Sequence, residues 1–267
     1  MQELPVKKLG FLFLFFCAAM PLAAEDGPKT EPVDPARGMT RSLNIEEAWV
    51  ENAAYVFSNL DNDLSAGHAW ELMGEWDFAF NPMFGGELDF PEVTMQQPLG
   101  NAPSTLAPVA LGFRFVPLQF GTPESDMAGV LGIEAEGAYW FSPQYDNFPG
   151  LGNSLTLEAM GGWRAGKVFL QGLGGYTSNL GQGAVSGGFV NVGLGWSMIP
   201  QWTPQFEVDF NDTTLLDDGS VGTQWTLLPQ IGFQSGEWTL EVGEEFGFVQ
   251  NAFQPDTATI LMIERDL

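Results

Sequence analysis

The sequence has very few cysteine and basic residues. Its only cysteine, Cys17, lies in an apolar run near the N-terminus, so a chain that loses this run on export would carry neither a thiol nor a disulfide. Nine lysines and arginines stand against 34 aspartates and glutamates, which gives a net charge of −25. Because no basic stripe is available to neutralise phosphates, nucleic acid is a poor partner. The acidity fits either affinity for cations or an acidic or saline habitat.

Histidine is equally scarce, and His68 is the only candidate for a histidine-dependent site. Its setting invites comparison with outer-membrane phospholipases, whose barrel has twelve strands and whose serine lies two residues after the histidine. Here that position is Trp70. The acidic turns 61–63 and 217–219 do not continue into a full calcium loop. We therefore predict no enzyme, no catalytic residue, no metal site and no cofactor.

No apolar run is long enough for a mature transmembrane helix. Residues 9–20 follow Lys7 and Lys8 and precede Ala23 and Ala24, the pattern of a signal peptide, residues 1–24, cleaved after export through the Sec pathway. Bulky residues before Cys17 argue against a lipid anchor there. Residues 25–42 are polar and rich in proline, which predicts a flexible periplasmic arm.

Instead of helices, the chain shows long runs with a period of two. Between residues 222 and 249, Trp225 and Ile231 share one parity with other apolar residues, and glutamines occupy the alternate positions. The pattern resumes after Ser235 and Gly236, as in a β-hairpin with a two-residue turn. Each arm is about a dozen residues long, which a tilted membrane-spanning strand requires. A soluble sandwich is the less favoured alternative.

About twelve such strands can be counted between residues 43 and 267, the first of them over residues 45–57 with Trp49, Tyr55 and Phe57 at one parity. Longer and shorter connections tend to alternate, as in outer-membrane barrels. Hydrocarbon requires every backbone polar group to be paired, and only closure removes the sheet edges. We therefore predict an all-β protein, a single antiparallel transmembrane barrel in the outer membrane with both termini in the periplasm.

The polar parity of these strands would face the lumen. Two interpretations stay open: a pore that favours cations, or a solvated interior whose charges do not select. Glu244 falls on the lipid parity and fits neither. The predicted lumen-lining residues are Glu71, Glu75, Asp77, Glu87, Asp89, Arg114, Glu134, Glu136, Glu158, Arg164, Glu207, Asp209, Glu241 and Glu245.

Acidic and aromatic strands such as residues 71–76 and 155–158 resemble a broad family of bacterial outer-membrane barrels of the transporter type, some linked to phenol degradation. The chain departs from these proteins by ending in Leu267, where an aromatic residue is usual. The leading hypothesis is a passive channel for small solutes whose acidic lumen favours neutral or cationic ones, with outer-membrane lipid and the barrel-assembly machinery as partners. The alternative is a non-conducting structural or scaffold protein with a plugged lumen. The sequence does not indicate the oligomeric state.

Overall fold

The structure is a computed structural model. It describes Met39 and residues 41–46, 48–63, 67–97, 108–121, 125–139, 153–180, 186–197, 201–215, 221–249 and 252–267, and it describes residues 61–63, 67–69, 92, 94–97, 213–215 and 252–256 by their backbone alone. All of these except Leu267 belong to one compact unit, residues 32–266. Among the described residues, no helix is long and apolar enough to cross a membrane. The predicted signal peptide, Cys17 and the predicted arm up to residue 38 lie outside the described part of the chain.

Twelve strands make up the unit. They are β1 (Ala53–Asp63), β2 (Gly67–Asn81), β3 (Phe84–Gln97), β4 (Val109–Phe120), β5 (Met127–Tyr139), β6 (Ser154–Ala165), β7 (Val168–Asn179), β8 (Gly187–Trp196), β9 (Trp202–Leu215), β10 (Val221–Ser235), β11 (Trp238–Val249) and β12 (Ala252–Asp266).

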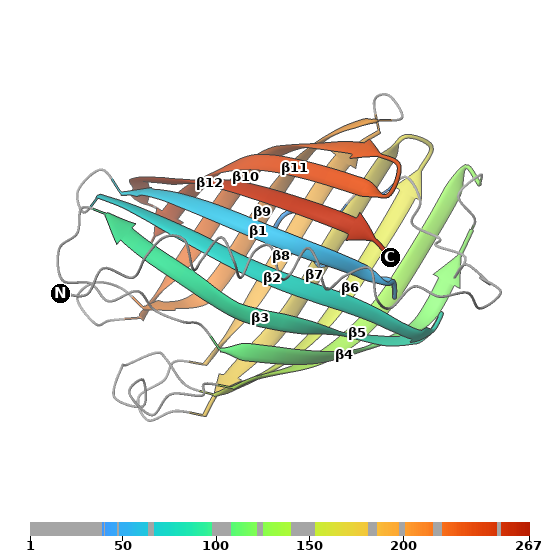
Figure 1. Cartoon of the computed structure of the whole chain (residues 1–267), viewed down its shortest axis with the longest axis horizontal. Coiled ribbons are helices and arrows are strands. Elements are labelled where there is room, and N and C mark those ends of the chain that lie inside the picture. The colour runs from blue at the N-terminus through green and yellow to red at the C-terminus, as the bar shows by residue number, and fades with distance from the viewer. Residues whose placement is uncertain are drawn as a thin grey trace, which may run out of the picture. The chain divides into compact units, whose positions relative to one another are not determined.

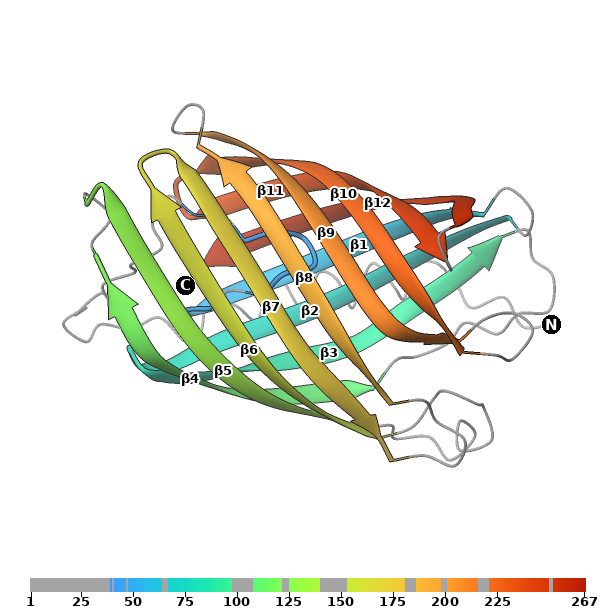
Figure 2. The same cartoon turned by 180° about the vertical axis from the view of Figure 1, so that it is seen from behind.

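Each strand pairs with its sequence neighbours in antiparallel fashion, and β1 pairs with β12 to close the barrel (Figures 1 and 2). At the seam Ala53 lies opposite Asp266, and Asn62 lies opposite Thr257. This closure confirms the predicted fold class and the number of strands. The connections at 82–83, 166–167 and 236–237 lie at one end, which we call the short-turn end, together with the start of β1 and the end of β12.

The outer surface of the barrel is apolar because one parity of each strand faces outward. On β6, for example, Leu155, Leu157 and Trp163 are exposed, while Met160 and Arg164 at the other parity are buried. Aromatic side chains gather near the short-turn end, among them Trp196, Trp202 and Trp238 at the ends of β8, β9 and β11. An apolar band bordered by aromatic residues is typical of a barrel that spans a membrane.

The first strand differs from the prediction. β1 begins at Ala53, and the residues before it are not a strand but lie inside the barrel. Tyr55 and Phe57 are buried among inward-facing residues, whereas the sequence put them on the apolar outer parity with Trp49. The prediction was wrong because these aromatic residues pack against a segment in the lumen, which the pattern of one strand does not reveal.

Strand β7 packs against the same segment, and both of its parities carry apolar residues. Phe169 and Leu173 point inward and are buried, and Val168, Leu170 and Tyr176 are exposed on the outer surface. Both faces of β7 therefore carry large apolar side chains. That explains why its sequence shows no clear period of two.

Candidate functional site

The lumen is filled by the described residues between 39 and 52, which we call the plug. Met39 comes near Gly162 of β6, close to the short-turn end, and Asn52 accepts a hydrogen bond from the backbone of Ala79 near the 82–83 turn. Between these two points the chain reaches up to Leu43 and Asn44 and turns back, with the amide of Ile45 bonded to the carbonyl of Ser42. The plug is therefore a loop inserted from the short-turn end, visible in Figure 2 as the blue segment inside the barrel.

Arg41 ties the ascending arm of the plug to the wall. Its guanidinium donates to both carboxylate oxygens of Glu75 on β2, at 2.6 and 3.2 Å. It also lies over the ring of Tyr55, 4.5 Å from the centroid, and over that of Phe57 at 5.1 Å. A buried bidentate pair combined with cation–π contacts is one of the stronger arrangements available to an arginine.

The tip of the plug is held by hydrogen bonds to the opposite side of the barrel. The hydroxyl of Ser42 donates to Glu207 of β9 at 2.5 Å, and the backbone amide of Leu43 donates to Gln230 of β10 at 2.9 Å. The side-chain amide of Asn44 donates to Asp209 at 3.0 Å. The wall carboxylates thus serve as acceptors for donors of the plug.

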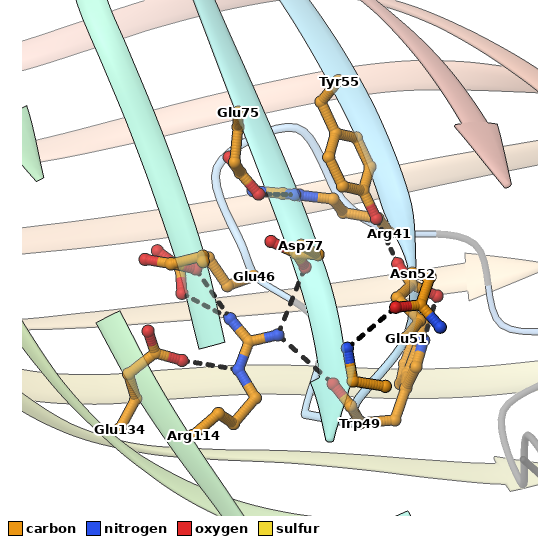
Figure 3. A network of polar contacts seen from close by, with 12 residues as sticks. Arg41, Glu46, Trp49, Glu51, Asn52, Tyr55, Glu75, Asp77, Arg114 and Glu134 are labelled. Carbon is orange, nitrogen blue, oxygen red and sulfur yellow. Dashed lines mark hydrogen bonds and ion pairs between the residues drawn. The ribbon is translucent and has the colours of Figure 1, made fainter. Parts of the chain in front are cut away.

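Arg114, which projects from β4, holds the descending arm (Figure 3). It donates to the carbonyl of Trp49 at 3.2 Å and contacts Glu46 at 3.1 Å, both in the plug. The same two terminal nitrogens also meet Asp77 at 3.5 Å and Glu87 at 2.8 Å, and Nε donates to Glu134 at 2.5 Å. A single guanidinium therefore neutralises part of a cluster of four carboxylates from three strands and the plug.

Apolar contacts and wall glycines complete the fit. Ile45, Ala48 and Trp49 join Met160 and Phe169 of the wall in one buried cluster. At several points the plug lies where the wall has no side chain. A Cβ added to Gly85 would meet Val50, one on Gly132 would meet the carbonyl of Ala48, one on Gly193 would meet Ile45 and Ser42, and one on Gly243 would meet Leu43.

Together these contacts cover much of the inner wall. Every strand contributes at least one inward residue that is less than 9% exposed, so water reaches little of the wall at the level of the plug. In strand order, such residues are Tyr55, Glu75, Glu87, Arg114, Glu134, Met160, Phe169, Gly193, Glu207, Leu228, Glu241 and Met262.

All fourteen residues predicted for the lumen lie on strands, at the inward parity. Eight are buried, and these are Glu75, Asp77, Glu87, Arg114, Glu134, Arg164, Glu207 and Glu241. The other six are partly buried, and these are Glu71, Asp89, Glu136, Glu158, Asp209 and Glu245. The structure brings Arg114 together with Asp77, Glu87 and Glu134, and it places Glu207 and Asp209 at the tip of the plug.

Arg164 has a different environment from that of Arg114. Its guanidinium donates to the carbonyls of Gly166 and Ser125, at 3.1 and 3.0 Å, in the connections after β6 and before β5. It therefore fastens two neighbouring connections at the short-turn end. Glu244 faces outward, as its parity predicts, and accepts a hydrogen bond from Thr259 of β12 at 2.8 Å.

Several groups of carboxylates come close enough to share a cation, and Glu87 belongs to three of them. One group joins Glu87 to Glu46 and Glu134, and another joins it to Glu75 and Asp77. In both groups the guanidinium of Arg114 is a counter-ion. Hard cations such as Ca²⁺ take carboxylate oxygens of this kind. The arrangement already contains a positive charge, however, so the carboxylates alone do not define a metal site.

Sequence reasoning missed the plug residues Arg41, Ser42 and Asn44, because it assigned residues 25–42 to an arm and residues 43–52 to the barrel. These three side chains carry the contacts with Glu75, Glu207 and Asp209. One signal was available. Glycines at inward positions, such as Gly132 and Gly193, leave room that something else must fill.

No protein-family model and no curated protein matches the sequence. Among solved structures, the NanC porin is 8% identical, with a TM-score of 0.52 over 80% of this chain and 100% of that one. The KdgM porin is 13% identical, with a TM-score of 0.47 over 80% and 99%. Outer membrane phospholipase A from Escherichia coli is 9% identical, with a TM-score of 0.45 over 80% and 92%. The likeness to NanC shows a shared fold.

Proposed function

We propose that the protein is an outer-membrane channel for small neutral or cationic solutes, and that the plug closes it in the conformation described above. The observation that carries the proposal is the plug itself, a loop seated in a membrane-type barrel and anchored largely through side chains. Such contacts can be exchanged for water without breaking the strand ladder. The barrel can therefore survive release of the plug, which would leave a lumen lined by carboxylates.

Cation preference follows from that lining. Once Arg41 leaves with the plug, the predicted lumen residues comprise twelve acids and two arginines, Arg114 and Arg164. Arg114 already faces Asp77, Glu87 and Glu134, so the two arginines leave the wall with a large excess of negative charge. Low-dielectric walls focus the field of such a surface, which concentrates cations and repels anions.

The second candidate is the non-conducting structural or scaffold protein. It is favoured by the completeness of the closure, since Glu207, Glu241 and Met262 have no exposed surface at all. In this case the plug would never leave the lumen. Transport of phenolic compounds, which the resemblance to phenol-degradation channels suggests, stays a finer prediction within the channel hypothesis, as does the absence of enzymatic activity. His68 does not bear on the choice, because its side chain lies outside the described part.

A disulfide lock separates the two candidates. A Cβ on Gly193 would lie 3.5 Å from the Cβ of Ser42, within the range found in disulfides. The pair Ser42→Cys and Gly193→Cys should therefore bridge plug and wall, and the chain without its signal peptide has no other cysteine. We expect no conductance in planar bilayers from the oxidised protein and cation-selective openings after reduction.

The single variants Ser42→Cys and Gly193→Cys serve as controls and should not respond to reductant. In the reduced double variant, Glu75→Lys should move the reversal potential in a KCl gradient toward anion selectivity. Equal conductance of the oxidised and reduced forms would show that the plug is not the barrier. A folded barrel that stays silent in both forms, and also when Arg41 is replaced, would favour the non-conducting candidate.

A further inference from the structure

A cavity lies in the lumen beyond the tip of the plug, on the side away from the short-turn end. Its volume is about 320 Å³, at the lower end of the range for small-molecule sites. Asn44 of the plug contributes to its lining, and the wall is made by residues of β8–β11. The lining residues are Asn44, Phe189, Asn191, Asp209, Phe210, Asn211, Gln224, Thr226 and Glu245.

The lining has a definite chemistry. Three asparagines, a glutamine and a threonine supply donors and acceptors, and Asp209 and Glu245 supply negative charge. None of the described residues that line the cavity is basic. The inward residue Phe189 adds an aromatic ring. Amides and hydroxyls recognise hydroxyl groups, whereas carboxylates with an aromatic face attract an ammonium group.

The cavity is also organised around the plug. The side chain of Asn191 donates to the carbonyl of Asn44 at 3.0 Å, and the side chain of Asn44 donates to Asp209 at 3.0 Å. These bonds fix Asn44 and orient Asp209 before any ligand arrives, which lowers the cost of ordering them on binding. A ligand bound here would contact the tip of the plug directly.

We propose that this cavity binds a small polyhydroxylated amine, such as an amino sugar in its ammonium form. Asp209 and Glu245 take the ammonium group, and the side-chain amides of Asn191, Asn211 and Gln224 take the hydroxyls. An inorganic cation would leave the N–H groups of these amides unused, because it takes oxygen ligands only, whereas a neutral sugar would gain nothing from the negative charge of Asp209 and Glu245. The inference rests on the proposed function, because it identifies this ligand as the solute that the channel admits.

Binding is measured by isothermal titration calorimetry on the full-length mature protein folded in detergent, with glucosamine as the probe and glucose as the matched neutral sugar. We expect glucosamine to bind and glucose to bind at least tenfold more weakly. Asp209→Asn keeps the shape of the side chain and its ability to accept from Asn44, and it should weaken glucosamine binding about tenfold or more. Glu245→Gln should do the same.

Glu237→Gln is the control, because it removes one negative charge at the short turn and should leave the affinity unchanged. Equal binding of glucose and glucosamine would overturn the assignment, as would glucosamine binding that ignores both cavity variants, or no binding to a folded barrel. The channel proposal is judged separately by the conductance of the reduced double-cysteine protein. Conductance without glucosamine binding refutes only the site, and binding without conductance refutes only the channel.

Discussion

Replacing Arg41 with methionine tests whether the plug is held by its contacts with the wall. Methionine keeps much of the length and apolar bulk of the side chain but removes the bidentate pair with Glu75 and the cation–π contacts with Tyr55 and Phe57. Removing one partner of a buried ion pair costs about 3–5 kcal/mol when the other charge stays buried. Here Glu75 is hydrated again once the plug leaves. The substitution therefore raises the free energy of the closed state and leaves that of the open state nearly unchanged.

The cost falls somewhat below that range, because methionine retains part of the packing against Tyr55 and Phe57. A loss of about 2–3 kcal/mol from the closed state raises the fraction of open molecules about 30- to 150-fold. The strand ladder does not contain Arg41, so the stability of the barrel itself should change little.

The assay uses the absence of other thiols. Ala48→Cys places a thiol in the buried cluster of the plug, where it reacts with a maleimide only when the plug opens. If opening and closing are fast, the labelling rate is proportional to the open fraction, so it should rise about 30- to 150-fold in the Arg41→Met background. Arg265→Met is the matched control, since Arg265 lies outside the plug, 4.0 Å from Glu237 and 5.4 Å from the ring centroid of Trp238. An unchanged labelling rate in a heat-modifiable, folded barrel would refute the idea that Arg41 holds the plug.

Three further variants test the packing. Gly132→Val should push against the carbonyl of Ala48 and speed the labelling of Ala48→Cys, whereas Gly137→Val on the same strand meets nothing within 4 Å and should not. Phe169→Ala removes a buried ring from the lumen cluster and should lower the free energy of unfolding by about 3–5 kcal/mol, measured by urea titration of vesicle-bound protein. Leu170→Ala, on the outer face of the same strand, should lower it clearly less. Glu244→Leu removes an acid from the outer face and should raise the free energy of unfolding by about 1 kcal/mol. A loss of stability would show that the hydrogen bond of Glu244 with Thr259 outweighs the cost of a carboxylate facing lipid.

The wall of the barrel could be predicted because lipid and lumen impose opposite demands on alternate residues. Strands such as β6 and β10 carry large apolar side chains at one parity and polar ones at the other, so their length and facing can be read from the sequence. Leu228 departs from this rule, since it lies at the inward parity of β10 and packs with Leu43 of the plug. Such departures mark contacts with a segment that the strand pattern does not contain.

The plug itself could not be predicted because it has no periodicity of its own. Residues 43–52 mix apolar and polar side chains, and Trp49 happens to continue the parity of Tyr55 and Phe57 in β1. A pattern of alternation alone therefore extends the strand too far. Tyr55 packs under the guanidinium of Arg41, and Arg41 in turn binds Glu75, which lies 34 residues away in the sequence. Only the three-dimensional arrangement shows that these residues meet.

The plug also gives the acidity of the wall a role that neither sequence interpretation includes. Buried carboxylates are costly unless they accept hydrogen bonds or face a positive charge. Glu75 and Glu207 meet these conditions through Arg41 and Ser42 of the plug, and Glu134 meets them through Arg114. Part of the acidic surface is therefore a docking surface for the plug. If the plug leaves as proposed, Glu75 and Glu207 return to water without their plug partners, so the same residues can stabilise the closed state and attract cations in the open one.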